Sequence, residues 1–257
     1  MELFVADLIE RFYTALWPFL RIGAMLIAVP VLSIDAVSVR IRIILTLALT
    51  LMIYPLVDWP TIDPVSAAGL SEIFNQILIG VLMGFFLQIV TAAVVVAGQA
   101  IANSMGLAMA TMVDPGVGTV PLMSQFLLIL GTLIFLGVGG HILMIGILLR
   151  SFETFPVGVA FISGANFTAL IEWSSMIFLG GMLMALPVLV ALLLVNIGVG
   201  VMTRAAPSLN IFAVGFPVFF LTGYAVLILS MAGIGARIQW LWMEGIERVK
   251  DFVLVPG

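Results

Sequence analysis

The 257-residue chain contains no cysteine, one histidine and one lysine. Without cysteine it has no disulfide, no thiolate nucleophile and no cysteine metal site. His141 has no second histidine with which to form a ligand pair. Charged residues make up 9% of the chain and the net charge is -4, which argues against nucleic acid as a partner. We therefore expect no metal, no cofactor and no nucleic-acid site.

The chain also lacks the residue constellations of an enzyme. Ser104 and His141 could imitate an intramembrane serine protease, but no glycine stands two positions before Ser104. An acid pair, a metal triad and a nucleotide-binding loop are missing as well. We expect a protein that is not an enzyme.

Hydrophobic residues are abundant. They make up 63% of the chain, and the mean hydropathy is +1.33. Soluble proteins carry about 25% charged residues, so this is a membrane-class composition. A membrane-spanning helix needs about 20 apolar residues. The sequence predicts an all-α membrane-type protein of about six long apolar helices arranged as hairpins, over residues 12–31, 41–57, 73–96, 122–149, 173–202 and 211–235.

A break is expected in the middle of the chain, over residues 98–121. No charged residue occurs between Glu72 and Asp114, and one helix of that length would reach about 60 Å, roughly twice the hydrocarbon core. Glycines and prolines gather in this stretch. Non-helical backbone at membrane depth survives only where protein buries it or water reaches it. The stretch is therefore predicted to line or close a path through an assembly.

Asp114, Pro115 and Gly116 have the pattern of a type II turn. Proline presets the backbone angle of the second turn residue, and glycine accepts the positive φ of the third. The Asp114 carboxylate can bond backbone amides of that turn, and the alternative is a proton-relay role. The turn-forming role is favoured.

Met105, Met109 and Met112 are spaced four and three residues apart, so their thioethers share one helical face. Flexible methionine side chains can seal around irregular partners as a gasket. Ordinary packing is the alternative. Gly80 and Gly84 have the small-xxx-small spacing of closely packed helices, and packing is the favoured interpretation there too.

Two arginines stand in or beside apolar runs. An ionisable group inside a membrane is costly, so each is a candidate functional residue. Arg21 could pair with a carboxylate of a neighbouring helix or subunit, or it could snorkel to an interface. Arg204 lies at a predicted hairpin tip, where it could bond an adjacent subunit or remain solvated.

The second predicted hairpin carries a specific motif. From Arg204 the chain reads R-A-A-P-S-L-N-I-F, with Pro207 and Asn210 inside it, and G-F-P follows at residues 215–217. This segment resembles the R-x-x-P-x-x-N-x-F and G-F-P signature of the FliR family of flagellar export-gate proteins. Arg21 and the mid-chain Asp-Pro are also placed as in that family.

The resemblance implies a structural subunit of a pore-forming gate in the bacterial inner membrane, within the flagellar basal body. The implied partners are FliP and FliQ, FlhB at the base, membrane lipid and the unfolded flagellar proteins that pass through. Residues 1–172 would form a FliP-like part, and residues 173–257 a FliQ-like hairpin with an amphipathic tail. The loop over residues 106–122 would plug the channel. The expected plug residues are Met105, Gly106, Met109, Met112, Asp114, Pro115, Gly116 and Gly118.

A different class of function remains as an alternative. An ion- or proton-coupled carrier could use Arg21, Asp114 and Arg204. Carriers usually contain repeats with matched broken helices. This sequence shows one broken segment without a counterpart in the other half, which favours the gate subunit.

Overall fold

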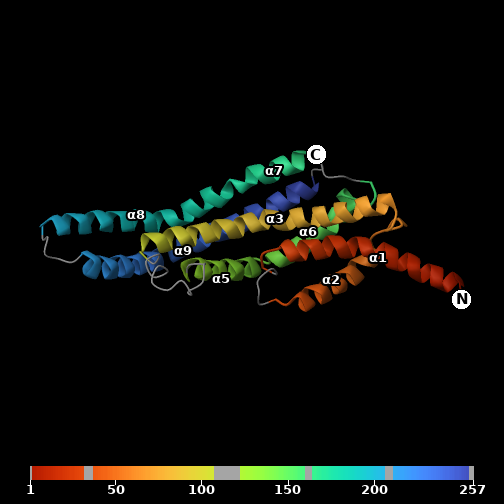
Figure 1. Ribbon diagram of the computed structural model, residues 1–257, viewed down its shortest axis with the longest axis horizontal. Coiled ribbons are helices and arrows are strands. Elements are labelled where there is room, and N and C mark those ends of the chain that lie inside the picture. The colour runs from red at the N-terminus through yellow and green to blue at the C-terminus, as the bar shows by residue number, and fades with distance from the viewer. Residues whose placement is uncertain (1, 32–36, 107–121, 160–163, 206–210, 255–257) are drawn as a thin grey trace. The chain divides into compact units, whose positions relative to one another are not determined.

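The computed structural model describes all residues except 1, 32–36, 107–121, 160–163, 206–210 and 255–257 (Figure 1). Helices account for its regular structure, and no strand occurs among the described residues. The expected all-α class is confirmed. The elements are α1 (Glu2–Ala28), α2 (Val39–Ile53), the 3-10 helix η1 (Tyr54–Leu56), α3 (Ala67–Ser104), α5 (Leu122–Gly137), α6 (Gly140–Thr154), α7 (Gly164–Ser174), α8 (Met176–Ala205) and α9 (Ile211–Leu254).

The helices pack into two compact units, each assembled from segments that are distant in the sequence. Unit 1 comprises Met1–Ile89, Gly139–Ser174 and Glu244–Gly257. Unit 2 comprises Val90–Val138 and Ser175–Met243. This grouping is based on packing alone. It does not test the expectation that residues 1–172 form a FliP-like part and residues 173–257 a FliQ-like hairpin, which stays a prediction.

In unit 1, α1 and α3 pack closely at two glycines. A β-carbon at Gly80 would collide with the carbonyl oxygen of Arg21, and one at Gly84 would collide with Ala28. Only hydrogen fits at these two positions, so the two helix backbones come close together. The expected packing role of the two glycines is confirmed.

In unit 2, α3 packs against the beginning of α5. A β-carbon at Gly98 would collide with the backbone of Ser124, and the Ser124 hydroxyl donates a 3.0 Å hydrogen bond to the Val95 carbonyl. Trp242 of α9 donates from Nε1 to the carbonyl oxygen of Gly131 on α5 at 2.9 Å. These bonds attach neighbouring helices to the backbone of α3 and α5.

The middle of the chain differs from expectation in two places. α3 continues through Gly98 to Ser104, so the break expected from residue 98 begins only after Ser104. Gly98 is a packing glycine and does not end the helix, because Ser124 occupies the space beside it. The span expected over residues 122–149 is interrupted between α5 and α6, where Gly139 has a φ of 71°.

The ends of the chain also form longer helices than expected. α1 begins at Glu2, well before the first expected span, and the last span and the amphipathic tail are one helix, α9. The tail continues α9 because Val249 and Phe252 are buried while Glu247 and Arg248 are exposed, so one face packs in unit 1. Between the spans expected over residues 122–149 and 173–202 the chain is partly helical, since α6 reaches Thr154 and α7 begins at Gly164.

Among the described residues, four helices are long and apolar enough to cross a membrane, or five if the bent pair α5 and α6 forms one span. Six were expected. α1 is not one of the four, since polar and charged residues such as Arg11 and Arg21 lower its hydropathy. The chain is therefore a membrane-type protein, and the expected number of about six long helices is approximate.

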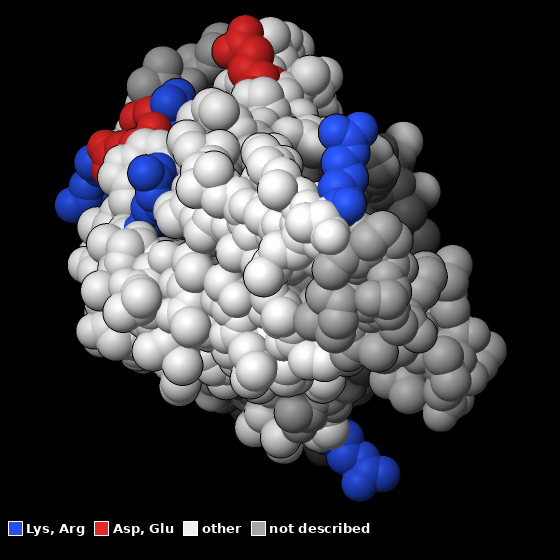
Figure 2. Space-filling view, turned by 90° about the vertical axis from the view of Figure 1, so that its left-hand side faces the viewer, with Lys and Arg blue, Asp and Glu red and all other residues white. Residues whose placement is uncertain are grey.

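Charge is divided unequally between the two units. The sequence has nine basic and 13 acidic residues, and unit 2 contains three of them, Asp114, Arg204 and Arg237. Figure 2 shows one face of the molecule, on which uncharged side chains cover most of the surface. The two packing units are thus also chemically different.

Candidate functional site

Arg21 is a fully buried charged residue of unit 1. It lies on α1 and has no exposed surface. Trp17, Ile22 and Met25 of the same helix are also buried, so α1 packs an apolar face against the core. The Arg21 guanidinium is buried together with these apolar side chains. A charge removed from water needs hydrogen-bond partners that replace its hydration.

All three guanidinium nitrogens of Arg21 donate hydrogen bonds. Nε donates to Gln76 Oε1 on α3 at 2.7 Å. Nη1 donates to the Ser151 carbonyl at 2.6 Å and to its hydroxyl at 3.1 Å. Nη2 donates to the Phe155 carbonyl at 2.7 Å. One side chain therefore joins α1 to α3 and to the end of α6.

An acid and an aromatic ring complete the surroundings of Arg21. Gln76 donates from Nε2 to the carboxylate of Glu72, which is also buried on α3. Gln76 thus connects the cation to an anion through a neutral amide. The Arg21 Cζ lies 4.2 Å from the centroid of the Phe152 ring, within the range of a cation–π interaction.

Arg21 also caps α6. This helix ends at Thr154, Phe155 is its C-cap, and its last turn contains no basic residue. The last carbonyls of a helix lack intrahelical partners and carry partial negative charge. By donating to the Phe155 carbonyl, and to the Ser151 carbonyl that also accepts the Phe155 N–H, Arg21 supplies the missing cation from another helix.

This geometry decides between the two interpretations of Arg21 within the chain. A side chain with no exposed surface does not reach an aqueous interface, so Arg21 does not snorkel. Its partners are carbonyls, a hydroxyl and an amide, with Glu72 beyond the amide. Within the described residues Arg21 bonds inside its own unit, and a bond to another subunit stays a prediction.

The expected plug begins at the end of α3. Gly106 has a φ of 77°, a left-handed conformation that favours glycine at the end of a helix. Its backbone N–H donates to the Asn103 carbonyl at 3.1 Å, and that of Met105 donates to the Ile101 carbonyl at 3.0 Å. The remaining expected plug residues, Met109, Met112, Asp114, Pro115, Gly116 and Gly118, lie outside the described residues.

Met105 is fully buried in unit 2. A β-carbon at Gly223 of α9 would lie 2.6 Å from Met105 Cγ and 3.1 Å from its sulfur. The glycine therefore makes room for the methionine, which holds the end of α3 against α9. Whether Met105 shares a sealing face with Met109 and Met112 stays a prediction.

Arg204 lies in the last turn of α8 and is exposed. A cation in this position interacts favourably with the helix dipole, by about 0.3–1 kcal/mol. The two other motif residues, Pro207 and Asn210, lie outside the described residues. Arg204 belongs to unit 2, whereas Arg21 belongs to unit 1.

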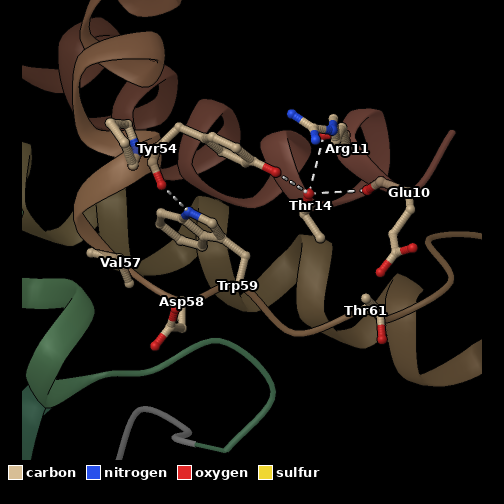
Figure 3. Close-up of a pocket in the computed structure, with 9 residues that line it drawn as sticks. Glu10, Arg11, Thr14, Tyr54, Val57, Asp58, Trp59 and Thr61 are labelled. Carbon is tan, nitrogen blue, oxygen red and sulfur yellow. Dashed lines mark hydrogen bonds between the residues drawn. The ribbon is translucent and has the colours of Figure 1, made fainter. Parts of the chain in front are cut away.

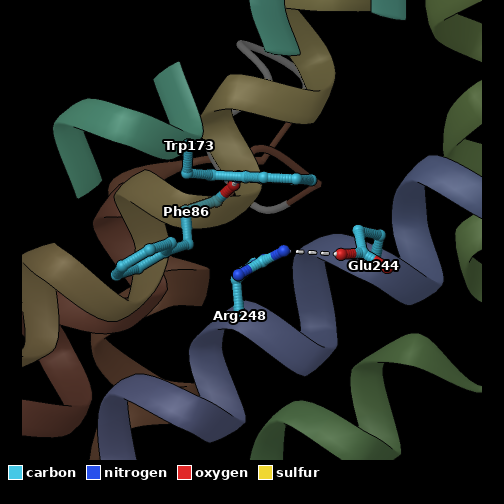
Figure 4. Close-up of polar contacts among 4 residues, drawn as sticks. All are labelled: Phe86, Trp173, Glu244 and Arg248. Carbon is cyan, nitrogen blue, oxygen red and sulfur yellow. Dashed lines mark hydrogen bonds and ion pairs between the residues drawn. The ribbon is translucent and has the colours of Figure 1, made fainter. Parts of the chain in front are cut away.

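Sequence reasoning missed a second polar arrangement in unit 1 (Figure 4). Trp173 is buried and donates from Nε1 to the Phe86 carbonyl of α3 at 3.0 Å. The Arg248 Cζ lies 5.5 Å from the centroid of the Trp173 ring, and Arg248 pairs with Glu244 at 3.0 Å. The i,i+4 spacing predicts the ion pair, but no sequence signal points to the tryptophan that lies beside it.

A pocket of about 410 Å³ opens between α1 and the segment that follows α2 (Figure 3). Thr14 Oγ1 and the Tyr54 hydroxyl are 2.8 Å apart, and Trp59 donates from Nε1 to the Tyr54 carbonyl at 2.8 Å. Glu10 and Asp58 supply the carboxylates of its lining. Within the described residues no group of three or more His, Asp or Glu could hold a metal ion.

Comparison with known proteins identifies the family. The model of the family described as bacterial export proteins, family 1, matches residues 12–245. The chain belongs to this family. FliR relatives cover nearly its full length. The flagellar biosynthetic protein FliR of Pectobacterium carotovorum subsp. carotovorum is 36% identical over 248 residues, 96% of this chain and 95% of that protein.

Two further FliR proteins show the same coverage. FliR of Escherichia coli K12 is 34% identical over 92% of this chain and 91% of that protein. FliR of Bacillus subtilis 168 is 28% identical over 98% of both. The chain is therefore a FliR-family component of a flagellar export apparatus, built from apolar helices of membrane type.

Proposed function

We propose that the chain is a structural subunit of the flagellar export gate. In this proposal it helps to form and close the channel that passes unfolded flagellar proteins across the bacterial inner membrane. It acts with FliP and FliQ, and FlhB lies at the base of the gate in the basal body. Family membership supports the export role, and the packing of unit 2 supports the closing role.

One observation carries the closing role: both ends of the segment over residues 107–121 are held within unit 2. Met105 packs into the space left by Gly223 at one end. At the other end, Ser124 lies against Gly98 and bonds the Val95 carbonyl. The residues on both sides of the expected plug are therefore anchored in the same packed unit, which supports the closing role.

The geometry of Arg21 weakens the carrier alternative. A coupling residue must change its protonation or its partners during transport, and arginine keeps its proton. Arg21 is fully buried and bonded to carbonyls of a helix end, to a hydroxyl and to Gln76. Such a side chain stabilises a packed core and offers no path to an ion.

Two measurements test the proposal. Co-expression with FliP and FliQ, followed by native mass spectrometry, is expected to yield one stable complex, and a well-behaved monomer in the presence of both partners would overturn the gate role. Deletion of residues 106–118 is expected to leave the complex assembled while ion leakage across the membrane increases. An assembled complex that stays as tight as the intact one would overturn the closing role alone.

A further inference from the structure

The exposed surface of α3 within unit 2 consists of carboxamides. Over residues 90–104, the exposed side chains are those of Gln99 and Asn103, and the apolar side chains are buried or half-buried. The two lie four residues apart and therefore on one face of the helix, one turn from each other. No hydrogen bond to either carboxamide occurs within the described residues.

The direction of this carboxamide pair, Gln99 and Asn103, is fixed by the opposite face of α3. Ile101 and Met105 have no exposed surface, and Ala102 has 1%. Met105 is held in the space beside Gly223. The end of α3 therefore cannot rotate without exposing its apolar face, and the two carboxamides stay directed away from the core of unit 2.

Most other exposed side chains of unit 2 are chemically different, although Gln125, Asn196 and Gln239 are exposed as well. The side chains that α8 and α9 expose are mostly large and apolar, such as Leu193 at 58% and Leu229 at 83% exposed. These are suited to lipid or to apolar partner helices. A carboxamide in hydrocarbon would lose its hydrogen bonds to water without replacement, so the α3 surface is suited to water.

We propose that Gln99 and Asn103 line the water-filled path and hydrogen-bond the backbone of the exported polypeptide as it passes. This inference rests on the proposed gate function and names the residues that contact the cargo. An extended chain has backbone N–H and C=O groups without internal partners, and a carboxamide offers both donors and acceptors. Because the pair is uncharged, acidic and basic segments are bound alike and neither is retained.

The absence of cysteine in the natural chain allows a direct test. Gln99→Cys and Asn103→Cys are compared with Leu193→Cys and Leu229→Cys in the assembled gate, using a charged, water-soluble methanethiosulfonate reagent. Thiolates react only where water reaches them, so positions 99 and 103 are expected to react at least about tenfold faster than 193 and 229. A stalled export substrate is expected to protect positions 99 and 103.

Equal, slow labelling at all four positions in an assembled, exporting gate would overturn the proposal and place this surface against protein or lipid. Labelling at 99 and 103 that a stalled substrate does not reduce would overturn the cargo contact. Failure of the gate to assemble with its partners would instead contradict the proposed function. The three results are therefore distinguishable.

A charge substitution of nearly unchanged shape provides a second test. Gln99→Glu combined with Asn103→Asp is expected to slow export of a substrate with an acidic stretch several-fold relative to one with a basic stretch. Gln239→Glu, at an exposed carboxamide of α9, is the matched control and is expected to leave the ratio unchanged. An unchanged ratio in the double variant would overturn the proposal.

Discussion

The Arg21 guanidinium donates a 2.7 Å hydrogen bond to the carbonyl oxygen of Phe155, a residue 134 positions further along the chain that caps α6. The bond joins the first helix of the protein to the end of a helix from its middle. Gln76 of α3 holds the same guanidinium from a third direction. The stability of unit 1 therefore depends on one charged side chain that no solvent reaches.

Replacing Arg21 by alanine is expected to destabilise unit 1 by about 3–5 kcal/mol, because the Phe155 and Ser151 carbonyls and Gln76 lose a buried partner. Arg21→Lys is expected to recover part of this loss, since an ammonium keeps the charge but cannot reach all the acceptors. The free energy of unfolding in detergent measures both effects. Arg248→Ala is the control, because that exposed ion pair contributes at most about 1 kcal/mol.

The close packing of α1 and α3 predicts a steric effect at Gly84. A leucine there would collide with Ala28, so Gly84→Leu is expected to destabilise the protein by at least about 2 kcal/mol. At Gly146 of α6 nothing lies within 4 Å of the added β-carbon, so Gly146→Leu should fold as the natural chain does. The thermal midpoints of the two variants test this difference, and similar midpoints would contradict close packing at Gly84.

Met105 and Gly223 are expected to behave as a coupled pair. Gly223→Ala would place a methyl group 2.6 Å from Met105 Cγ and displace the methionine, which loosens the end of α3. Adding Met105→Ala is expected to relieve the collision, so the double variant should lose less stability than the sum of the two single losses. A double-mutant cycle on unfolding free energies measures the coupling, and additive losses would show that the two residues do not share this space.

A substitution at Asp114 distinguishes the gate function from the carrier function. If it forms a turn, Asp114→Asn keeps an oxygen acceptor for backbone amides and is expected to retain most export activity. If it carries protons, the same change would abolish coupled transport. Measuring flagellar protein export in cells that carry the variant decides between the two, and loss of export with normal assembly would favour the carrier.

The sequence predicts the helices well where composition alone decides, and poorly where packing does. The apolar runs correctly predict the all-α class, and the spacing of Gly80 and Gly84 correctly predicts their packing role. The helix end expected near Gly98 was wrong, because glycine signals either a break or a close approach, and only the position of Ser124 distinguishes the two. The sequence does not predict the helix interruption at Gly139, because apolar residues continue on both sides of it.

The Arg21 site shows the same limit. A buried arginine could be singled out from the sequence because few charges occur in the apolar runs. Its acceptors could not be predicted, since most are backbone carbonyls, which every residue possesses. The Ser151 hydroxyl and the Gln76 amide belong to residue types that recur along the chain. Only the folded arrangement selects them.

Unit 1 combines α1 with the end of α9, and this governs the order in which it is completed during translation. Arg21 is synthesised 55 residues before Gln76 and 130 before Ser151. Phe155, the last acceptor, follows Arg21 by 134 residues, so at about 5–20 residues per second the guanidinium waits roughly 7–27 s. Phe252, which packs on Phe86 and Phe155, emerges later still. The guanidinium therefore stays without its full set of acceptors while 134 residues are added, and unit 1 closes only after the end of α9 has emerged.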